Sequence, residues 1–162
     1  MIGNDIIDLA LAKKESNWKR EGFLNKIFTA EEQLLIFQSS NPENMVWNLW
    51  SRKEAAYKIY NRQTQIRTYN PLQLVCSDVY CEVGKVICKE NVYFVKTEIT
   101  NEYIYTIAVT DIQQFKKLES VDSVIKIYKK EGIPEILLGN DTIAKPISIS
   151  HHGKFERKVM IS

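Results

Sequence analysis

Hydrophobic residues recur at intervals of three and four along residues 43–61, which is the spacing of an amphipathic helix. A shorter helix is predicted to begin after Thr29 and to continue to about Phe37, because Thr29 and Glu32 have the spacing of a capping box. The break Ser40-Asn41-Pro42 would separate the two helices. The apolar positions of the longer helix are Val46, Leu49, Trp50, Ala56, Tyr57 and Tyr60.

The first part of the chain and the region after the long helix have different patterns. Residues 1–9 form a short apolar run that suits a strand whose end presents carboxylates. The basic segment over residues 10–26 is compatible with a helix interrupted at Gly22. Residues 72–109 are rich in Val, Ile, Tyr and Thr and contain turn-forming breaks, so we expect three or four antiparallel strands there.

The last part of the chain is predicted to combine one more helix with short strands. Residues 120–130 have a helical pattern, since Lys129 and Lys130 would complement the helix dipole just before Gly132. Residues 134–162 indicate two or three short strands. Helices mixed with runs of strands, without regular alternation, predict an α+β fold built as a single domain, with an antiparallel sheet packed against helices.

Composition narrows the class of protein. The 162 residues are 44% hydrophobic, which is enough for the core of one globular domain. A net charge of +2 is too small to favour non-specific binding to nucleic acid. With no apolar run of membrane-spanning length and no signal-peptide pattern, a cytoplasmic protein without membrane contact is expected. Cys76, Cys81 and Cys88 lack the spacing of a zinc site or a disulfide framework and are expected to be reduced strand residues.

Two acidic residues near the N-terminus are candidates for metal binding. The run GNDIID supplies Asp5 and Asp8. One or two carboxylates, together with substrate phosphate oxygens and water, commonly hold Mg²⁺ in proteins. By themselves, two acids in this position are more often structural.

The long helix carries a third carboxylate in an unusual setting. Glu54 lies at the margin of an aromatic stripe formed by Trp47, Trp50 and Tyr57, with Lys58 one turn ahead. We therefore expect Glu54 to be partly desolvated, which raises the pKa of a carboxylate, while the nearby cation lowers it. Such a carboxylate can bind a metal or act as a base of tuned strength, and the alternative is a plain Glu–Lys helix pair.

Near the C-terminus, ISISHHG places Ser148 and Ser150 on one face of a strand that ends at His151. Hydroxyls and an imidazole at the end of a strand can receive a phosphate group. A surface turn is the alternative. No acidic partner lies within sequence reach, so a catalytic triad with a serine nucleophile is not expected.

Read together and in this order, GNDIID, WSRKEAAYK and ISISHHG resemble the motifs of the 4′-phosphopantetheinyl transferase superfamily. The family patterns are Gly-x-Asp near a strand end, a Trp/Phe-Ser-x-Lys-Glu-Ala/Ser-x-x-Lys helix and a Ser-x-Ser-His strand. Residues 50–58 fill each defined position of the helix pattern. KIFTAEE and Gly132-Ile133-Pro134 are similar to two further family segments, although Ile133 replaces the lysine of a Gly-Lys-Pro turn. The resemblance implies a 4′-phosphopantetheinyl transferase-like fold.

The resemblance also implies an activity. A phosphopantetheinyl transferase moves the phosphopantetheine arm of coenzyme A onto a serine of an apo acyl or peptidyl carrier protein and releases 3′,5′-ADP. By this resemblance, Asp5 and Glu54 would bind Mg²⁺, with Asp8 as a possible further ligand. Glu54 would also take the proton of the carrier serine, and Lys58 would stabilise the phosphate oxygens.

Binding sites and assembly follow from the same resemblance. Ser150 and His151, with Ser148 as a weaker candidate, would hold the adenosine 3′-phosphate of coenzyme A. The order of the motifs is similar to the short holo-acyl-carrier-protein synthase type, which implies a homotrimer with sites between subunits, whereas Leu49-Trp50-Ser51 is more similar to the longer two-half transferases. Since carrier proteins are usually acidic, a docking face is expected at Lys13, Lys14, Lys19, Arg20 and Lys26, and the alternative is a solvated basic helix without a partner.

Two other functions compete with this hypothesis. A non-catalytic module of the same fold would bind coenzyme A or a carrier protein without transferring anything. A nucleic-acid-binding protein would use the N-terminal basic segment together with Trp18, but the nearly balanced charge argues against it.

Overall fold

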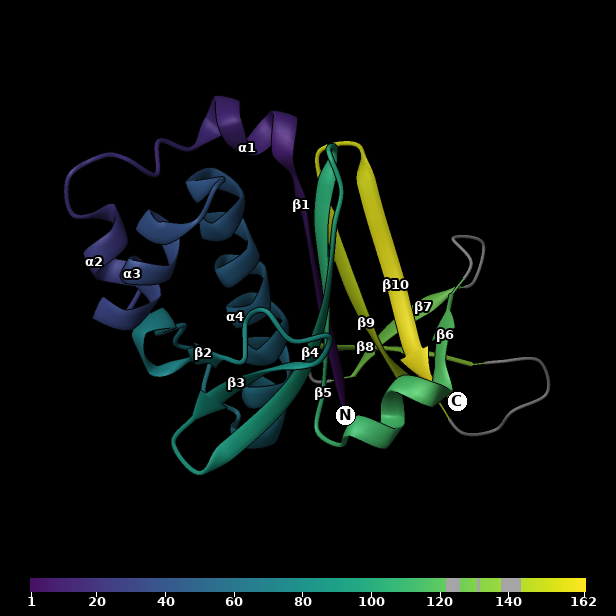
Figure 1. Ribbon diagram of the computed structural model, residues 1–162. Coiled ribbons are helices and arrows are strands. Elements are labelled where there is room, and N and C mark those ends of the chain that lie inside the picture. Colours follow the sequence, from purple (N-terminus) through teal and green to yellow (C-terminus); the bar gives the residue numbers. More distant parts are fainter. Residues whose placement is uncertain (122–125, 131, 138–143) are drawn as a thin grey trace.

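A computed structural model describes residues 1–121, 126–130, 132–137 and 144–162. Two antiparallel five-stranded sheets lie side by side, and the helices cover one face of the first sheet (Figure 1). In spatial order, the first sheet contains β1 (Ile2–Asp8), β5 (Tyr103–Val109), β4 (Asn91–Ile99), β3 (Gly84–Cys88) and β2 (Val75–Ser77). The second contains β6 (Leu118–Ser120), β10 (Phe155–Ile161), β9 (Lys145–His152), β8 (Ile133–Ile136) and β7 (Ile127–Lys130). The α+β class expected from the sequence is confirmed.

The helices begin and end close to the predicted positions. The basic N-terminal segment forms two helices instead of one interrupted helix, because the chain is irregular from Ser16 to Gly22 and Gly22 adopts a left-handed φ of 77° at the start of the second. The helices are α1 (Leu9–Glu15), α2 (Phe23–Ile27), α3 (Ala30–Gln38) and α4 (Pro42–Thr64), with short 3₁₀ turns η1 (Pro71–Gln73) and η2 (Ile112–Lys117).

The long helix α4 forms the centre of the main core. Its N-terminus is capped by Asn41, whose side-chain oxygen accepts a hydrogen bond from the Asn44 amide at 3.1 Å, and Pro42 occupies the first turn. The apolar side of α4 packs on the first sheet and contacts β1 most closely at Gly3. A Cβ at Gly3 would collide with the Ala55 carbonyl oxygen, so only glycine allows this approach.

The predicted capping box of α3 is present and connects to α4. Thr29 accepts a hydrogen bond from the Glu32 amide at 3.3 Å, and Glu32 accepts one from the Thr29 amide at 2.9 Å. The same Glu32 carboxylate forms a fully buried ion pair with Lys53 of α4 at 2.7 Å. One local helix signal therefore also fixes how α3 packs against α4.

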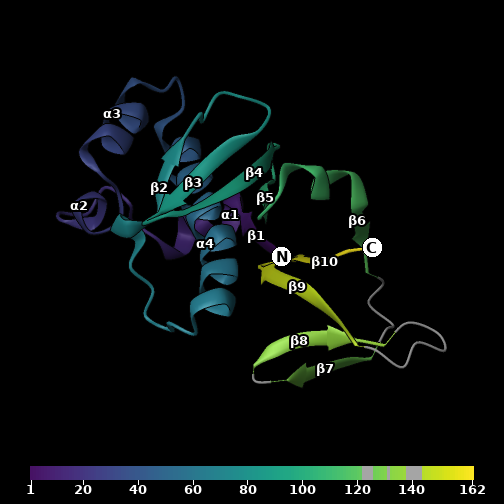
Figure 2. The same cartoon turned by 90° about the horizontal axis from the view of Figure 1, so that it is seen from below.

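The second sheet has a smaller core and meets the first sheet at β1. Its buried apolar residues form two small groups, one around Val159 and one around Ile136 and Ile147. Seen from below, β9 and β10 lie beside β1, while β7 and β8 extend away from the helices (Figure 2). The three strands of the C-terminal part confirm the expectation for residues 134–162.

One predicted helix is wrong. Of residues 120–130, the described parts are extended: Ser120 ends β6, and Ile127–Lys130 forms β7, while 122–125 lie outside the described residues. Ile127 is paired with Ile136 of β8 and packs against the small core around Ile136. Antiparallel pairing with β8, which begins only three residues after Lys130, thus outweighs the helix-end signal of the two lysines.

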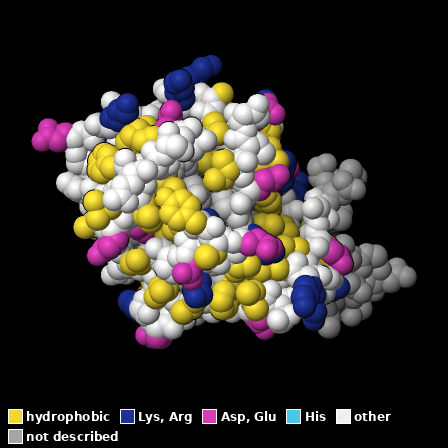
Figure 3. Space-filling model, in the orientation of Figure 1, with side chains coloured by type: hydrophobic (Ala, Val, Ile, Leu, Met, Phe, Trp, Pro, Cys, Tyr) yellow, Lys and Arg dark blue, Asp and Glu magenta, His cyan; other side chains and the backbone are white. Residues whose placement is uncertain are grey.

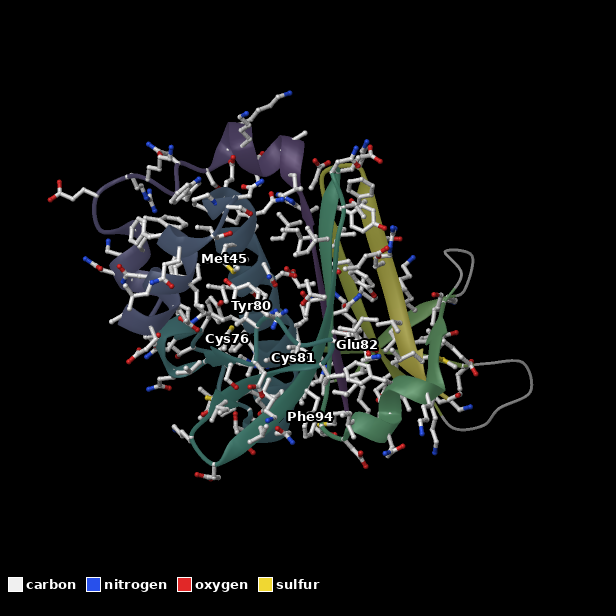
Figure 4. All side chains as sticks on the ribbon, in the orientation of Figure 1. Met45, Cys76, Tyr80, Cys81, Glu82 and Phe94 are labelled. Carbon is white, nitrogen blue, oxygen red and sulfur yellow. The ribbon has the colours of Figure 1, made fainter. Side chains whose placement is uncertain are left out.

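All three cysteines are free, as expected, but only two lie in strands. Cys76 and Cys88 are buried in β2 and β3, whereas Cys81 is exposed in the turn between these strands. Figure 4 labels Cys76 and Cys81 with their neighbours. None of the helices in the described part of the chain combines the length and apolar character that a membrane span needs.

Candidate active site

Asp5 and Glu54 line the same pocket, of about 250 Å³, between β1, α1 and α4. Asp5 shares a face of β1 with Gly3, because alternate residues of a strand point to the same side, so the close approach at Gly3 brings the Asp5 carboxyl near α4. Two tryptophans of α4, Trp47 and Trp50, form an apolar wall of this pocket. The predicted pairing of these two carboxylates is therefore present in the structure.

The Asp5 carboxyl is poorly solvated. Its Oδ2 atom is buried and has no hydrogen-bond partner among the described residues. Burial raises the pKa of Asp5 to about 7, and the neighbouring Glu54 carboxylate adds to this effect, while Lys58 opposes it. A buried carboxylate oxygen without a partner has a high free energy, which a bound cation would lower.

Glu54 is half-buried, as its position beside the aromatic stripe predicted. Burial raises its pKa, and the nearby Lys58 ammonium and Tyr69 hydroxyl only partly offset this. Tyr69 packs edge-on against Trp50, with ring centroids 6.0 Å apart, and sequence reasoning did not identify it. The plain Glu–Lys helix pair does not describe this site, because no ion pair joins Glu54 and Lys58 among the described contacts.

Lys58 instead joins three elements. Its Nζ atom donates hydrogen bonds to the backbone oxygens of Asn4 in β1, at 2.6 Å, and Ile149 in β9, at 3.0 Å. Burial lowers the pKa of this lysine, while the Asp5 and Glu54 carboxylates raise it. An ammonium group has three donors, so one N–H remains for a ligand.

The two predicted serines of β9 differ in their surroundings. Ser148 is buried, donates to Asn4 Oδ1 at 2.7 Å and accepts from the Asn4 amide at 2.9 Å, so its hydroxyl is already used inside the protein. The Ser150 hydroxyl is buried but has no partner among the described residues. His151 is exposed and lines the pocket of Asp5 and Glu54. Ser150 and His151 remain candidates for a ligand, whereas Ser148 has a structural role.

Asp8 lies outside the pocket and is engaged elsewhere. Its Oδ1 accepts from the Leu11 amide at 3.1 Å as the N-cap of α1, and its Oδ2 accepts from the Lys154 amide at 3.2 Å. These hydrogen bonds lower its pKa. The turn containing Gly153 lies so close to Asp8 that a Cβ there would collide with the carboxyl group. Asp8 therefore fixes the β9–β10 turn against β1. This structural role could not be predicted from the sequence, which shows only that Asp5 and Asp8 both lie near the N-terminus.

His152, which sequence reasoning did not single out, helps to fix this turn. Its Nδ1 accepts a hydrogen bond from the Asp8 amide at 2.8 Å. The Asp and Ser-His motifs thus meet within one chain, through contacts between residues about 144 positions apart. Bringing these motifs together requires no second subunit.

A second pocket, of about 440 Å³, opens one to two turns further along α4. Among the described residues, its charged lining groups are all cations: Lys58, Arg62 and Arg67. Gly132, Ile133 and Pro134, the segment similar to the family's Gly-Lys-Pro turn, contribute to its opposite wall. The arrangement favours an anionic ligand. Arg62 and Arg67 were not predicted, although Arg62 follows Lys58 by one helical turn.

The basic residues proposed for docking are all exposed. Lys13 and Lys14 lie on α1, Lys19 and Arg20 in the loop that follows, and Lys26 on α2. None of them forms an ion pair within the described residues. Dark-blue side chains of Lys and Arg are visible along the upper edge of the molecule in Figure 3, the edge at which α1 lies in Figure 1. α1 also borders the pocket of Asp5 and Glu54 through Ala12.

The carboxylate pair fits a magnesium site to which the protein itself contributes few ligands. No group of three or more His, Cys, Asp or Glu side chains within the described residues could hold a metal. Mg²⁺ commonly uses only one or two carboxylates and completes its shell with water and substrate phosphates. The unpartnered Asp5 oxygen and the raised pKa values of Asp5 and Glu54 are what such a site would show without its cation.

The sequence matches the family model described as the 4′-phosphopantetheinyl transferase superfamily over residues 1–108. The match covers two thirds of the chain, so the chain belongs to this superfamily of transferases. It includes Asp5, Glu54 and Lys58 and ends before the second sheet begins. No curated protein matches the chain.

Proposed function

We propose that this protein is a Mg²⁺-dependent 4′-phosphopantetheinyl transferase of the holo-acyl-carrier-protein synthase type, acting on coenzyme A and an apo acyl or peptidyl carrier protein. The observation that carries the proposal is the pocket in which Asp5 and Glu54 face His151 in a chain of this superfamily. We treat residues 1–162 as one transferase domain, because the residues of the proposed site come from both sheets.

Asp5 and Glu54 would hold Mg²⁺ together with the pyrophosphate of coenzyme A, and the cation would supply charge neutralisation for the leaving group. The two carboxylates are suited to this role because burial disfavours their charge unless a cation is nearby. Asp8 is better described as a structural cap than as a further ligand, since both of its oxygens accept backbone hydrogen bonds.

In the transfer, the hydroxyl oxygen of the carrier serine would attack the β-phosphate of coenzyme A. A new bond forms between that oxygen and phosphorus, and the bond from the β-phosphorus to the bridging oxygen breaks, so that 3′,5′-ADP leaves. Glu54, directly or through a water molecule, would take the serine proton; its raised pKa makes it a base of moderate strength. The free N–H of Lys58 would donate to a phosphate oxygen.

The adenosine 3′-phosphate would be held by Ser150 and His151. The Ser150 hydroxyl has an unused hydrogen-bonding capacity, and His151 is accessible from the pocket. Ser148 would act indirectly, by keeping β9 in register with Asn4 of β1. Carrier proteins would approach from the side of α1, which carries Lys13 and Lys14 and borders the pocket through Ala12.

The test is the mass of an apo acyl carrier protein after incubation with this protein, coenzyme A and Mg²⁺. A gain of one phosphopantetheine is expected, and Glu54→Gln should slow the transfer by about 10² to 10⁴-fold, because the base is lost. Glu119→Gln, the same exchange at an exposed position of β6 outside the pocket, serves as a control. If coenzyme A binds but no carrier gains mass, the protein is a binding module and the proposal is wrong.

A further inference from the structure

The two sheets meet along a seam that is closed by side chains rather than by a backbone ladder. Among the described strands, β1 is an edge strand whose backbone pairs with β5 alone, and β8 pairs with the first two residues of β9. The backbone N–H and C=O groups of successive residues point to opposite edges of a strand, so residues two apart share an edge. The carbonyls of Ile2 and Asn4 in β1 and of Ile147 and Ile149 in β9 therefore point into the seam.

Two cations of α4 fill this seam at regular intervals. Lys58 donates to the oxygens of Asn4 and Ile149, as described above. One turn later, Arg62 donates from Nη1 to the Ile2 oxygen at 2.9 Å and from Nη2 to the Ile147 oxygen at 2.8 Å. Each cation thus bridges one carbonyl of β1 and one of β9.

The geometry explains why this pattern repeats. Four residues of a helix rise about 6 Å, and two residues of a strand advance about 6.6 Å, so side chains at i and i+4 match carbonyls two residues apart. The planar guanidinium of Arg62 presents two N–H groups in a fixed fork and so sets the separation of the two strands, which a flexible ammonium group cannot do as rigidly.

The position of β9 matters for the site because this strand carries Ser150 and His151, while β1 carries Asp5. Around these residues the strands share few other polar links: Asn4 with Ser148, and the hydrogen bond between Asp8 and His152 at the far end. Arg62 anchors the opposite end of the seam. It lies two helical turns from Glu54 and outside the family's helix motif, which ends at Lys58.

We propose that Arg62 is a positioning residue that fixes β9 against β1 and so holds Ser150 and His151 at the distance from Asp5 and Glu54 that coenzyme A requires. This inference rests on the proposed function. Because Ser150 and His151 would contact a part of coenzyme A that does not react, loosening β9 should weaken binding of the ground state and the transition state alike. The carboxylates on β1 and α4 would be undisturbed.

The test compares Arg62→Gln with Arg67→Gln. Both remove one positive charge from the lining of the same pocket, but only Arg62 bridges the strands. In the ligand-free protein, hydrogen–deuterium exchange of a peptide covering β9 should be faster by about tenfold in Arg62→Gln, since two charge-assisted hydrogen bonds are lost, and unchanged in Arg67→Gln. The KM for coenzyme A should rise by about tenfold in Arg62→Gln, with kcat changed by less than about threefold.

Arg62→Lys distinguishes positioning from general stability. A lysine can bridge two carbonyls, as Lys58 does, so it should restore most of the protection of β9 and part of the KM. Unchanged exchange in Arg62→Gln would overturn the proposal and make the arginine a pocket charge only. A lower kcat with an unchanged KM would equally overturn it, since it indicates a smaller folded fraction.

The exchange experiment remains decisive if no carrier protein is modified. Calorimetric binding of 3′,5′-ADP then replaces the KM as the second readout. Faster exchange of β9 in Arg62→Gln but not in Arg67→Gln, together with a larger loss of 3′,5′-ADP binding in Arg62→Gln than in Arg67→Gln, would support the positioning role even though the transferase proposal had failed. Equal binding by the wild type and Arg62→Gln would overturn it.

Discussion

Two neighbouring residues of α4, Lys53 and Glu54, belong to the same sequence motif but lie in opposite kinds of environment. Lys53 pairs with Glu32 at 2.7 Å and also donates to the Pro71 oxygen at 2.8 Å. The other oxygen of Glu32 accepts from the Cys76 amide at 2.8 Å. This buried ion pair is complete, so it has no capacity for a ligand.

The other face of the helix is open. Glu54 and Asp5 share a pocket, both pKa values are raised, and Lys58 donates to backbone carbonyls instead of forming an ion pair with either carboxylate. On the Lys53 side of α4, ion pairing and hydrogen bonds compensate the burial of charge. On the Glu54 side, the buried carboxylates have no ion pair among the described residues to compensate them. The difference separates residues that hold the helix in place from residues available for chemistry, although all of them appear as acids and lysines in the sequence.

The largest effect on stability is expected from Lys53→Met. The change leaves the Glu32 carboxylate buried without its cation, which should lower the free energy of unfolding by about 3–5 kcal/mol. Chemical denaturation would measure this loss. Lys116→Met, at an exposed position of η2, is the matched control and should change little. Equal effects of the two substitutions would show that the buried Lys53–Glu32 pair contributes no more to stability than an exposed lysine does.

Asp5→Asn should change stability in the opposite direction and raise the free energy of unfolding. The folded protein binds the Asp5 proton more tightly than the unfolded chain, because the pKa is raised from 3.8 to about 7. Stability attributable to this group therefore falls as pH rises from about 4 to about 7, and removing the charge should stabilise the metal-free protein at pH 8 by about 4 kcal/mol, since one pKa unit corresponds to about 1.4 kcal/mol. The gain should vanish near pH 4. Glu21→Gln, at an exposed site, should show no such pH dependence. If Asp5→Asn stabilises the protein equally at all pH values, the gain does not come from a buried Asp5 carboxylate without a cation.

The smallest of these effects concerns how a carrier protein reaches the pocket of Asp5 and Glu54. Replacing Lys13 and Lys14 by Glu should raise the KM for an acidic carrier protein by about tenfold at low salt and less at high salt, with the KM for coenzyme A unchanged. Replacing Lys116 and Lys117 by Glu gives the same change in net charge at η2. If both double variants behave alike, net charge alone governs the encounter and α1 is not the docking face.

Local patterns predicted most of the fold. The spacing of apolar residues located α4, and the Thr29–Glu32 pair located the start of α3, because both signals act within a few residues. The pattern failed at Ile127–Lys130, where pairing with β8 determines the conformation. β8 begins only three residues after Lys130, so this pairing is short in range. Two lysines before a glycine also fit a helix end, and they carry no information about pairing between strands.

The geometry of the candidate site was predictable in part. The motif proposed Asp5, Glu54 and Lys58 as site residues, and the structure brings the first two into one pocket. It could not separate Ser148 from Ser150, since only the contact with Asn4 shows that the Ser148 hydroxyl is already used. Arg62 was missed because its role depends on two strand edges that meet only in the folded chain.

The titration of Asp5 shows whether the Asp5 side of α4 is an uncompensated carboxylate site. NMR of metal-free protein with ¹³C-labelled aspartate would follow the carboxyl resonance between pH 3 and 9, with Asp5→Asn providing the assignment. We expect a midpoint near 7 for Asp5. A midpoint near the ordinary value of 3.8 would mean that the Asp5 carboxylate is already compensated, as the Glu32 carboxylate is, and that this pocket is not an open carboxylate site.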